Sequence, residues 1–150
     1  MIYLGSDHRG FALKEKLKNM LTEWGYDYED MGPFEYNKDD DYPDFATAVG
    51  QAVALSLSKG NEAKGILICG SGVGVSATAN KIKGIIAGTM FDVEQVKASV
   101  ADEDTNIIGL SHDYSTEENN IAIAKAFLES KFSGLDRHIR RVNKIKQLEK

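Results

Sequence analysis

The chain has 150 residues, of which 42% are hydrophobic and 27% charged, with a formal net charge of −5 and an isoelectric point near 5.2. These values are typical of one folded domain, and the acidic balance argues against a general nucleic-acid binder. No apolar run approaches the roughly 20 residues of a membrane span, and a single cysteine excludes an intrachain disulfide or a cysteine-based zinc site. The N-terminus leads directly into an apolar segment. We therefore expect a cytoplasmic protein with neither a nucleic-acid nor a membrane partner.

Apolar spacing predicts strands and helices that alternate along the chain. Gly25 is a natural helix stop, Asp44 and Asp92 are expected helix caps, and Ser115 or Thr116 caps a later helix. The expected elements, in chain order, are a strand over 2–4, a helix over 11–24, a strand over 26–31, a helix over 45–58, a strand over 65–69, a helix over 75–81, a strand over 85–91, a helix over 93–101, a strand over 106–110, and helices over 117–131 and 136–148.

This alternation predicts an α/β fold, a Rossmann- or flavodoxin-like three-layer sandwich whose five-stranded parallel sheet is covered on both faces. Residues 1–150 form one domain, and the last helix is a C-terminal extension that can pack on a second subunit. The first and third strands should be neighbours. In such folds ligands bind at the carboxyl ends of the strands.

The run Ile68-Cys69-Gly70-Ser71-Gly72-Val73-Gly74 is the most informative part of the sequence. A buried strand ends in the only cysteine, and a loop with three alternating glycines leads into a helix. Backbone N–H groups in such a loop can point at an anion. A thiol at its edge is a candidate base or nucleophile, because the thiolate is the reactive form and nearby amides favour it.

Other interpretations of this run stay open. A single cysteine is often only a small buried residue, and glycines also permit tight turns that bind nothing. A dinucleotide site is a third interpretation, but its fingerprint has glycines at the first, third and sixth positions. Here the sixth position is Val75, although the acidic Asp92 follows at a suitable distance.

Two further groups are candidates for the site. Asp7 and His8 follow the first strand and could face Cys69, or they could form only a turn. We also expect Asp92 and the segment 102–106 at strand ends. Arg137 and Arg141 are four residues apart on the last helix and could clamp a phosphate, or they could lie on a solvated basic face.

Six segments together resemble the ribose-5-phosphate isomerase B family, which includes allose- and galactose-phosphate isomerases. The resemblance spans nearly the whole chain. The segments are Gly5-Ser6-Asp7-His8-Arg9-Gly10, Asp41-Tyr42-Pro43, Ile68 to Gly74, Ala79-Asn80-Lys81, Asp104-Thr105-Asn106 and Arg137-His138 with Arg141-Val142.

The resemblance implies an aldose–ketose isomerase of phosphorylated sugars that needs no cofactor and no metal and works as a homodimer, with a tetramer as the alternative. Cys69 would move the proton between C1 and C2, Ser71 would assist at the sugar oxygens, and amides of 70–74 would hold the enediolate. The implied substrate contacts are Asp7, His8, Tyr42, Gly70, Gly72, Val73, Gly74, Asn80, Glu103, Arg137 and Arg141.

The sequence departs from the family pattern at two places. A His-Asn pair, whose histidine opens the sugar ring, is replaced by Asp102-Glu103, and an arginine after the fifth strand is replaced within Ser111-His112-Asp113. Asp102 is the candidate for the ring-opening role, and His112 the candidate for the arginine's role. The sequence therefore predicts ribose 5-phosphate isomerisation. A hexose 6-phosphate or atypical sugar as substrate, and a non-catalytic sugar-phosphate binder, are the alternatives.

Overall fold

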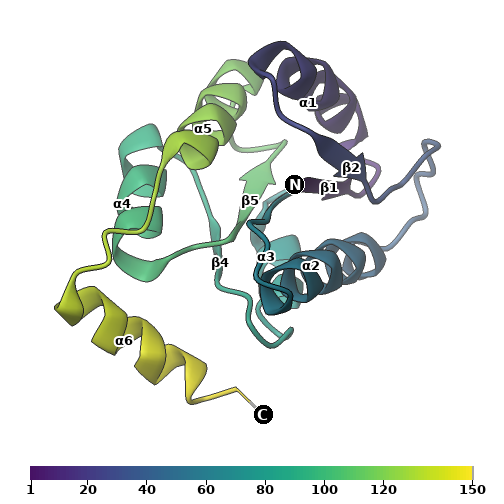
Figure 1. Ribbon diagram of the computed structural model, residues 1–150. Helices are drawn as coiled ribbons and strands as arrows, with labels where there is room; N and C mark the ends of the chain where they lie inside the picture. Colours follow the sequence, from purple (N-terminus) through teal and green to yellow (C-terminus); the bar gives the residue numbers. More distant parts are fainter. Residues whose placement is uncertain (150) are drawn as a thin grey trace.

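The computed structural model describes residues 1–149, which form five strands and six helices (Figure 1). The elements, in chain order, are β1 (Ile2–Ser6), α1 (Phe11–Trp24), β2 (Tyr28–Asp30), α2 (Tyr42–Ser58), β3 (Lys64–Cys69), α3 (Val73–Ala79), β4 (Ala87–Thr89), α4 (Val93–Glu103), β5 (Ile107–Ser111), α5 (Glu117–Glu129) and α6 (Asp136–Lys146).

All five strands are parallel and lie in the order β2-β1-β3-β5-β4. The predicted α/β fold is confirmed, and β1 and β3 are neighbours as expected. The central strand β3 is buried on both faces, as its continuous apolar sequence indicates. Because β5 lies beside β3 and β4 is at the edge, the loops that follow β1, β3 and β5 are adjacent at one end of the sheet.

Two apolar cores cover the two faces of the sheet, which makes the three layers visible in Figure 1. Helices α1, α4 and α5 pack on one face, against Ile66 and Ile68 of β3. Helices α2 and α3 pack on the other face, against Leu67 and Cys69. The period-two alternation of a strand thus points the Cys69 side chain toward α2 and α3.

Most helix ends lie where the sequence predicts them. Gly25 closes α1 in the left-handed conformation, with φ of 84°, and the side chains of Asp92 and Thr116 cap α4 and α5. The predicted cap at Asp44 is wrong. Helix α2 begins at Tyr42, because Asp41 has the extended N-cap conformation and Pro43 suits the first turn of a helix.

The expectation that 102–106 follows a strand is also wrong. Helix α4 continues to Glu103, and Asp104 ends it with φ of 55°. This segment therefore precedes β5 and lies at the amino end of the strands. Helix α6 packs beside α4 through His138 and Val142, which are its buried residues. It extends away from the sheet at the bottom of Figure 1.

Candidate functional site

Cys69 lies at the centre of the candidate site, between the loops that follow β1 and β5. The backbone N–H of Asp7 donates to the carbonyl of Ile68 (3.2 Å), and that of His112 donates to the carbonyl of Cys69 (3.0 Å). Cys69 is a free thiol and is 4% exposed. Three strands of the sheet thus fix the position of one nearly buried sulfur.

The glycine loop after Cys69 makes a tight turn into α3. Gly72 has φ of 76°, and its carbonyl accepts hydrogen bonds from the hydroxyls of Ser76 and Thr89, both at 2.9 Å. The Ser71 hydroxyl accepts from the N–H of Val73 (3.2 Å). These bonds hold the loop in one conformation, which is the preorganisation an anion site requires.

Tyr42 reaches this loop from the start of α2. A Cβ placed on Gly74 would lie 2.6 Å from the Tyr42 ring, so the ring packs directly against the glycine backbone. Val73 is 56% exposed beside it. The structure therefore brings Tyr42, Cys69, Ser71 and the segment 70–74 together, as the sequence predicts.

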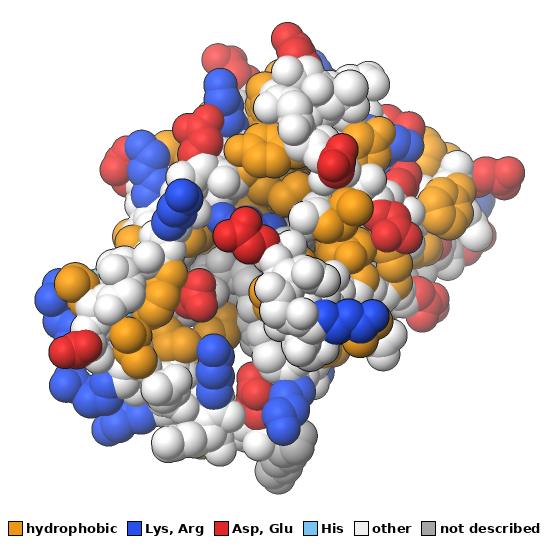
Figure 2. Space-filling view, viewed as in Figure 1, with side chains coloured by type: hydrophobic (Ala, Val, Ile, Leu, Met, Phe, Trp, Pro, Cys, Tyr) orange, Lys and Arg blue, Asp and Glu red, His pale blue; other side chains and the backbone are white. Residues whose placement is uncertain are grey.

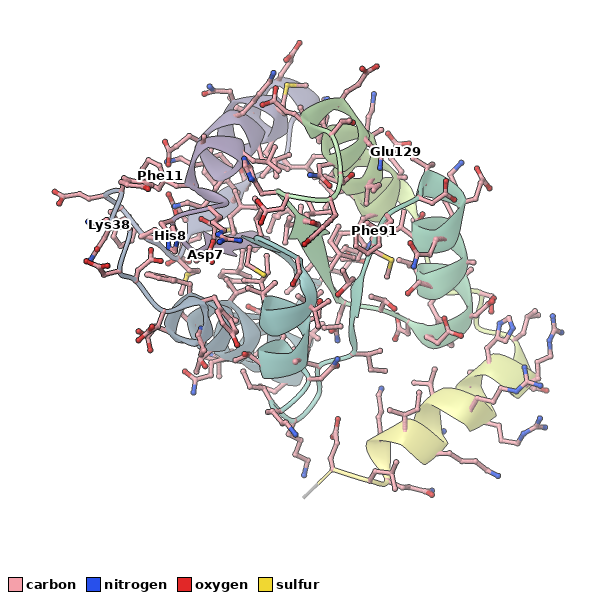
Figure 3. The ribbon with its side chains drawn as sticks, turned by 180° about the vertical axis from the view of Figure 1, so that it is seen from behind. Asp7, His8, Phe11, Lys38, Phe91 and Glu129 are labelled. Carbon is pink, nitrogen blue, oxygen red and sulfur yellow. The ribbon has the colours of Figure 1, made fainter. Side chains whose placement is uncertain are left out.

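Asp7 and His8 join the same end of the sheet from β1. Figure 3 shows them close together, with Phe11 of α1 and Lys38 of the loop after β2 nearby. Asp7 is buried, and its Oδ1 accepts from the backbone N–H groups of Arg9 (2.9 Å) and Gly10 (3.2 Å). The predicted turn is thus present at Asp7, while the His8 ring is held separately, by Asp40 (2.7 Å).

The loop after β5 adds a pair that the sequence prediction missed. Arg9 Nη1 donates to Asp113 Oδ2 (2.6 Å), and His112 lies 3.0 Å from the other oxygen of that carboxylate. The hydrogen bond from His112, followed by the charges of Arg9 and His112, lowers the pKa of Asp113. No local pattern joins residues 104 positions apart, so only the parallel pairing of β1, β3 and β5 could have indicated this contact.

A second group of predicted residues lies elsewhere, where α4 meets α6. The Asp102 carboxylate is 3.5 Å from Nε2 of the mostly buried His138, whose Nδ1 is 2.6 Å from the Ser133 hydroxyl. Burial and the neighbouring Asp102 charge raise the pKa of Glu103, outweighing the opposite effect of His138. Within one chain, this group is not assembled with Cys69.

Arg137 and Arg141 are exposed on the same helix, α6, and Figure 2 shows lysine and arginine side chains gathered in this region. Asn80 is also distant from the glycine loop, because it ends α3 near the start of β4. Its amide donates to and accepts from the backbone of Ala87, both at 2.8 Å. In the chain as described, the Asn80 side chain therefore fixes the α3–β4 connection.

No helix within residues 1–149 has the length and apolar character needed to cross a membrane. The same residues contain no group of three histidine, cysteine or acidic side chains positioned to hold a metal ion.

Comparison with known proteins places the chain among sugar-phosphate isomerases. The model of the Ribose/Galactose Isomerase family matches residues 2–145. Ribose-5-phosphate isomerase B of Mycolicibacterium paratuberculosis is 32% identical over 149 residues, which are 99% of this chain and 91% of the relative.

Two crystal structures have the same fold over almost their whole length. Ribose-5-phosphate isomerase B from Mycoplasma genitalium, with bound ribulose 5-phosphate, matches with a TM-score of 0.91 and 36% identity, over 97% of this chain and 93% of that one. The ribose 5-phosphate isomerase from Thermotoga maritima matches with a TM-score of 0.88 and 36% identity, over 98% and 97%. The chain described here belongs to the ribose/galactose isomerase family.

Proposed function

We propose that this protein interconverts ribose 5-phosphate and ribulose 5-phosphate, with Cys69 as the group that moves the proton. The observation that carries the proposal is the position of Cys69, held between three strand ends and followed directly by the preorganised glycine loop. The relative with bound ribulose 5-phosphate supports the choice of sugar. A cytoplasmic location belongs to the same proposal, because phosphorylated sugars are charged and enter apolar membranes poorly.

The chemistry follows from the residues at the strand ends. The Cys69 thiolate takes the proton from C2 of the open-chain aldose, and the electron pair moves onto the carbonyl oxygen at C1 to give an enediolate. In this proposal, amides of 70–74 stabilise that oxygen, and such donors contribute about 3 kcal/mol each. Ser71 transfers the proton between the two sugar oxygens, and the Cys69 thiol returns its proton to C1. The ketose leaves with no net gain or loss of protons.

The remaining substrate contacts divide between two copies of the chain in this proposal. Asp7, His8, Tyr42 and Val73 contact the sugar from the same chain as Cys69. Asp102, Glu103, Arg137 and Arg141 lie on α4 and α6 and would reach a strand-end site only from a second subunit. The assignment of both groups to one site therefore requires a homodimer. Asp102 takes the ring-opening role, and the arginines take the phosphate.

Exchange of the C2 proton with solvent tests the assignment of the base. Wild-type protein in deuterated buffer should exchange the C2 proton of ribose 5-phosphate with solvent. Cys69→Ala should abolish this exchange, while its thermal unfolding temperature should stay that of the wild type. Cys69→Ala that still exchanges would remove Cys69 from the role of base.

Asp102→Asn tests the ring-opening role. The isomerisation rate of this variant should fall more for the cyclic sugar than for an analogue fixed in the open-chain form.

A second candidate, a sugar-phosphate-binding protein without turnover, rests on one observation. The family resemblance leads one to expect an arginine after the fifth strand that is free to bind phosphate. In this chain the same loop holds Asp113, which is paired with Arg9. Calorimetry and turnover on the same panel of ribose, allose and galactose phosphates separate the two functions. Binding without turnover of any sugar supports this candidate, and turnover of one sugar excludes it.

A further inference from the structure

Arg9 is unlike the other arginines of the chain in its position. Three of the four arginines lie on α6, and Arg9 alone follows a strand of the sheet. A Cβ built on Gly70 would lie 2.7 Å from Arg9 Nη1 and 3.0 Å from its Cδ. The guanidinium is therefore in contact with the glycine loop, one residue from Cys69.

Both members of the Arg9–Asp113 pair are fixed by backbone hydrogen bonds at this end of the sheet. The Arg9 N–H donates to Asp7 Oδ1 (2.9 Å), and the Asp113 N–H donates to the carbonyl of Gly70 (3.0 Å). The side chains nonetheless remain accessible, with exposed fractions of 57% for Arg9 and 32% for Asp113. An anion can thus approach the guanidinium without moving the backbone.

Several carboxylates lie near the Arg9 guanidinium and would repel an anionic substrate. Asp7, Asp40 and Asp113 place three carboxylates around the loop that follows β1, where the His8 ring pairs with Asp40 and the His112 ring with Asp113. A phosphorylated substrate entering here would meet repulsion from those carboxylates. Arg9 is a permanent positive charge next to the glycine loop that offsets this repulsion.

We propose that Arg9 is a substrate-binding residue that takes the anionic group of the substrate in exchange for Asp113. This rests on the proposed function. An exposed ion pair contributes little to stability, so it is readily exchanged, whereas the planar guanidinium gives phosphate paired, charge-assisted hydrogen bonds. Asp113 holds Arg9 against the loop between turnovers and competes with the phosphate for it.

The alternative is that the ion pair only joins two loops and binds no ligand, a role that we call a latch. The chain offers a matched control for that role, because Lys16 donates to Glu117 and thereby joins α1 to the start of α5. That pair is also exposed, with fractions of 49% for Lys16 and 55% for Glu117, and bridges nearly the same separation in sequence, but it lies on helices and not at the glycine loop. Lys16→Ala therefore removes a comparable surface latch.

Calorimetric binding of inorganic phosphate to the full chain tests the proposal without turnover. Arg9→Ala should weaken phosphate binding at least about tenfold, and Arg9→Lys should weaken it less. Asp113→Asn should strengthen binding, because it removes the competing charge and retains the shape of the side chain. Lys16→Ala should leave binding unchanged.

Equal phosphate affinity in wild type, Arg9→Ala and Asp113→Asn would overturn the proposal and leave the pair as a latch. If Arg9→Ala does not fold, the opposite directions expected for Arg9→Lys and Asp113→Asn still decide. In the isomerase assay, Arg9→Ala should raise KM for ribose 5-phosphate more than it lowers kcat. A wild-type protein without turnover would contradict the proposed function, while the phosphate series would still stand as the test of Arg9.

Discussion

One oxygen of Asp40, Oδ1, accepts two hydrogen bonds from His8, from its backbone N–H at 3.0 Å and from its ring Nδ1 at 2.7 Å. An ionised carboxylate can only accept, so Nδ1 carries a proton and Nε2 is the ring atom left for a ligand. Asp40 belongs to the loop after β2, and its carboxylate is 7% exposed. The tautomer and the orientation of His8 are thus set from outside the strand that carries it.

Asp40→Asn should lower kcat/KM about tenfold, because an amide can present either an oxygen or an N–H to Nδ1 and no longer fixes the tautomer. Steady-state kinetics with ribose 5-phosphate measures the effect. Asp39→Asn changes the exposed neighbouring carboxylate and is the control. An identical kcat/KM in the two variants would show that the orientation of His8 does not matter for the reaction.

Gly72→Ala should destabilise the fold more than Gly60→Ala, as measured by urea unfolding. Both glycines have a positive φ, 76° and 79° respectively, which costs an alanine about 1 kcal/mol. A Cβ at Gly60 would meet open space, whereas one at Gly72 would lie 2.9 Å from Thr89 Cγ2. The difference between the two variants measures the crowding at the glycine loop, and equal losses would mean that the loop relaxes freely.

Asp30→Asn should make the protein less stable at neutral pH and remove part of its sensitivity to acid. Burial pushes the pKa of Asp30 up, but hydrogen bonds from Lys14, Gly32 and Lys18 outweigh it and hold the pKa below 3.8. A lowered folded pKa gives stability that is fully present above the unfolded value and is lost as the pH falls through the folded one. Removing one member of a buried pair costs about 3 kcal/mol or more.

The measurement for this pair is urea unfolding of both proteins between pH 7 and pH 2.5. The stability difference between wild type and Asp30→Asn should be greatest at pH 7 and shrink below about pH 3.8. Glu15→Gln removes an exposed partner of the same Lys18 and should cost about 0.5 kcal/mol or less. A difference that stays constant with pH would mean that Asp30 has the same pKa in the folded and unfolded chain.

Mixing two inactive variants should restore activity if each site takes residues from two subunits. Cys69→Ala and Arg141→Ala should each be inactive or nearly so alone. After joint refolding, half of the dimers are mixed, and each mixed dimer holds one intact site, which gives about a quarter of wild-type activity. Mixing Cys69→Ala with Ser71→Ala is the control and should restore nothing, because both residues belong to the same loop.

Local sequence patterns predict much of this structure because the relevant interactions are local. Gly25, Asp92 and Thr116 act within one helical turn, so their residue types reveal the helix ends. The start of α2 differs from the prediction although the sequence contains a signal for it. Pro43 suits the first turn of a helix and places the cap at Asp41.

The parts of the site that escaped prediction depend on long-range geometry. The Arg9–Asp113 contact exists because β5, and not β4, lies beside β3, and no residue pattern specifies that order. The expectation that Asp102 follows a strand was wrong because residues 102–106 connect α4 to the start of β5. Apolar spacing also does not show where α4 ends. Asp104 in the left-handed conformation ends that helix after Asp102 and not before it.

Lys14 is fully buried, with its ammonium bonded to Asp30 (2.6 Å) and to the carbonyl of Pro33 (2.7 Å). An amine reagent cannot reach Nζ while α1 lies against this part of the chain. The rate at which Lys14 is modified therefore reports how fast that region opens. Exposed lysines such as Lys16 react at a rate set only by the intrinsic reactivity of the reagent. The modification rate of Lys14 thus measures local unfolding at a residue that takes no part in the proposed reaction.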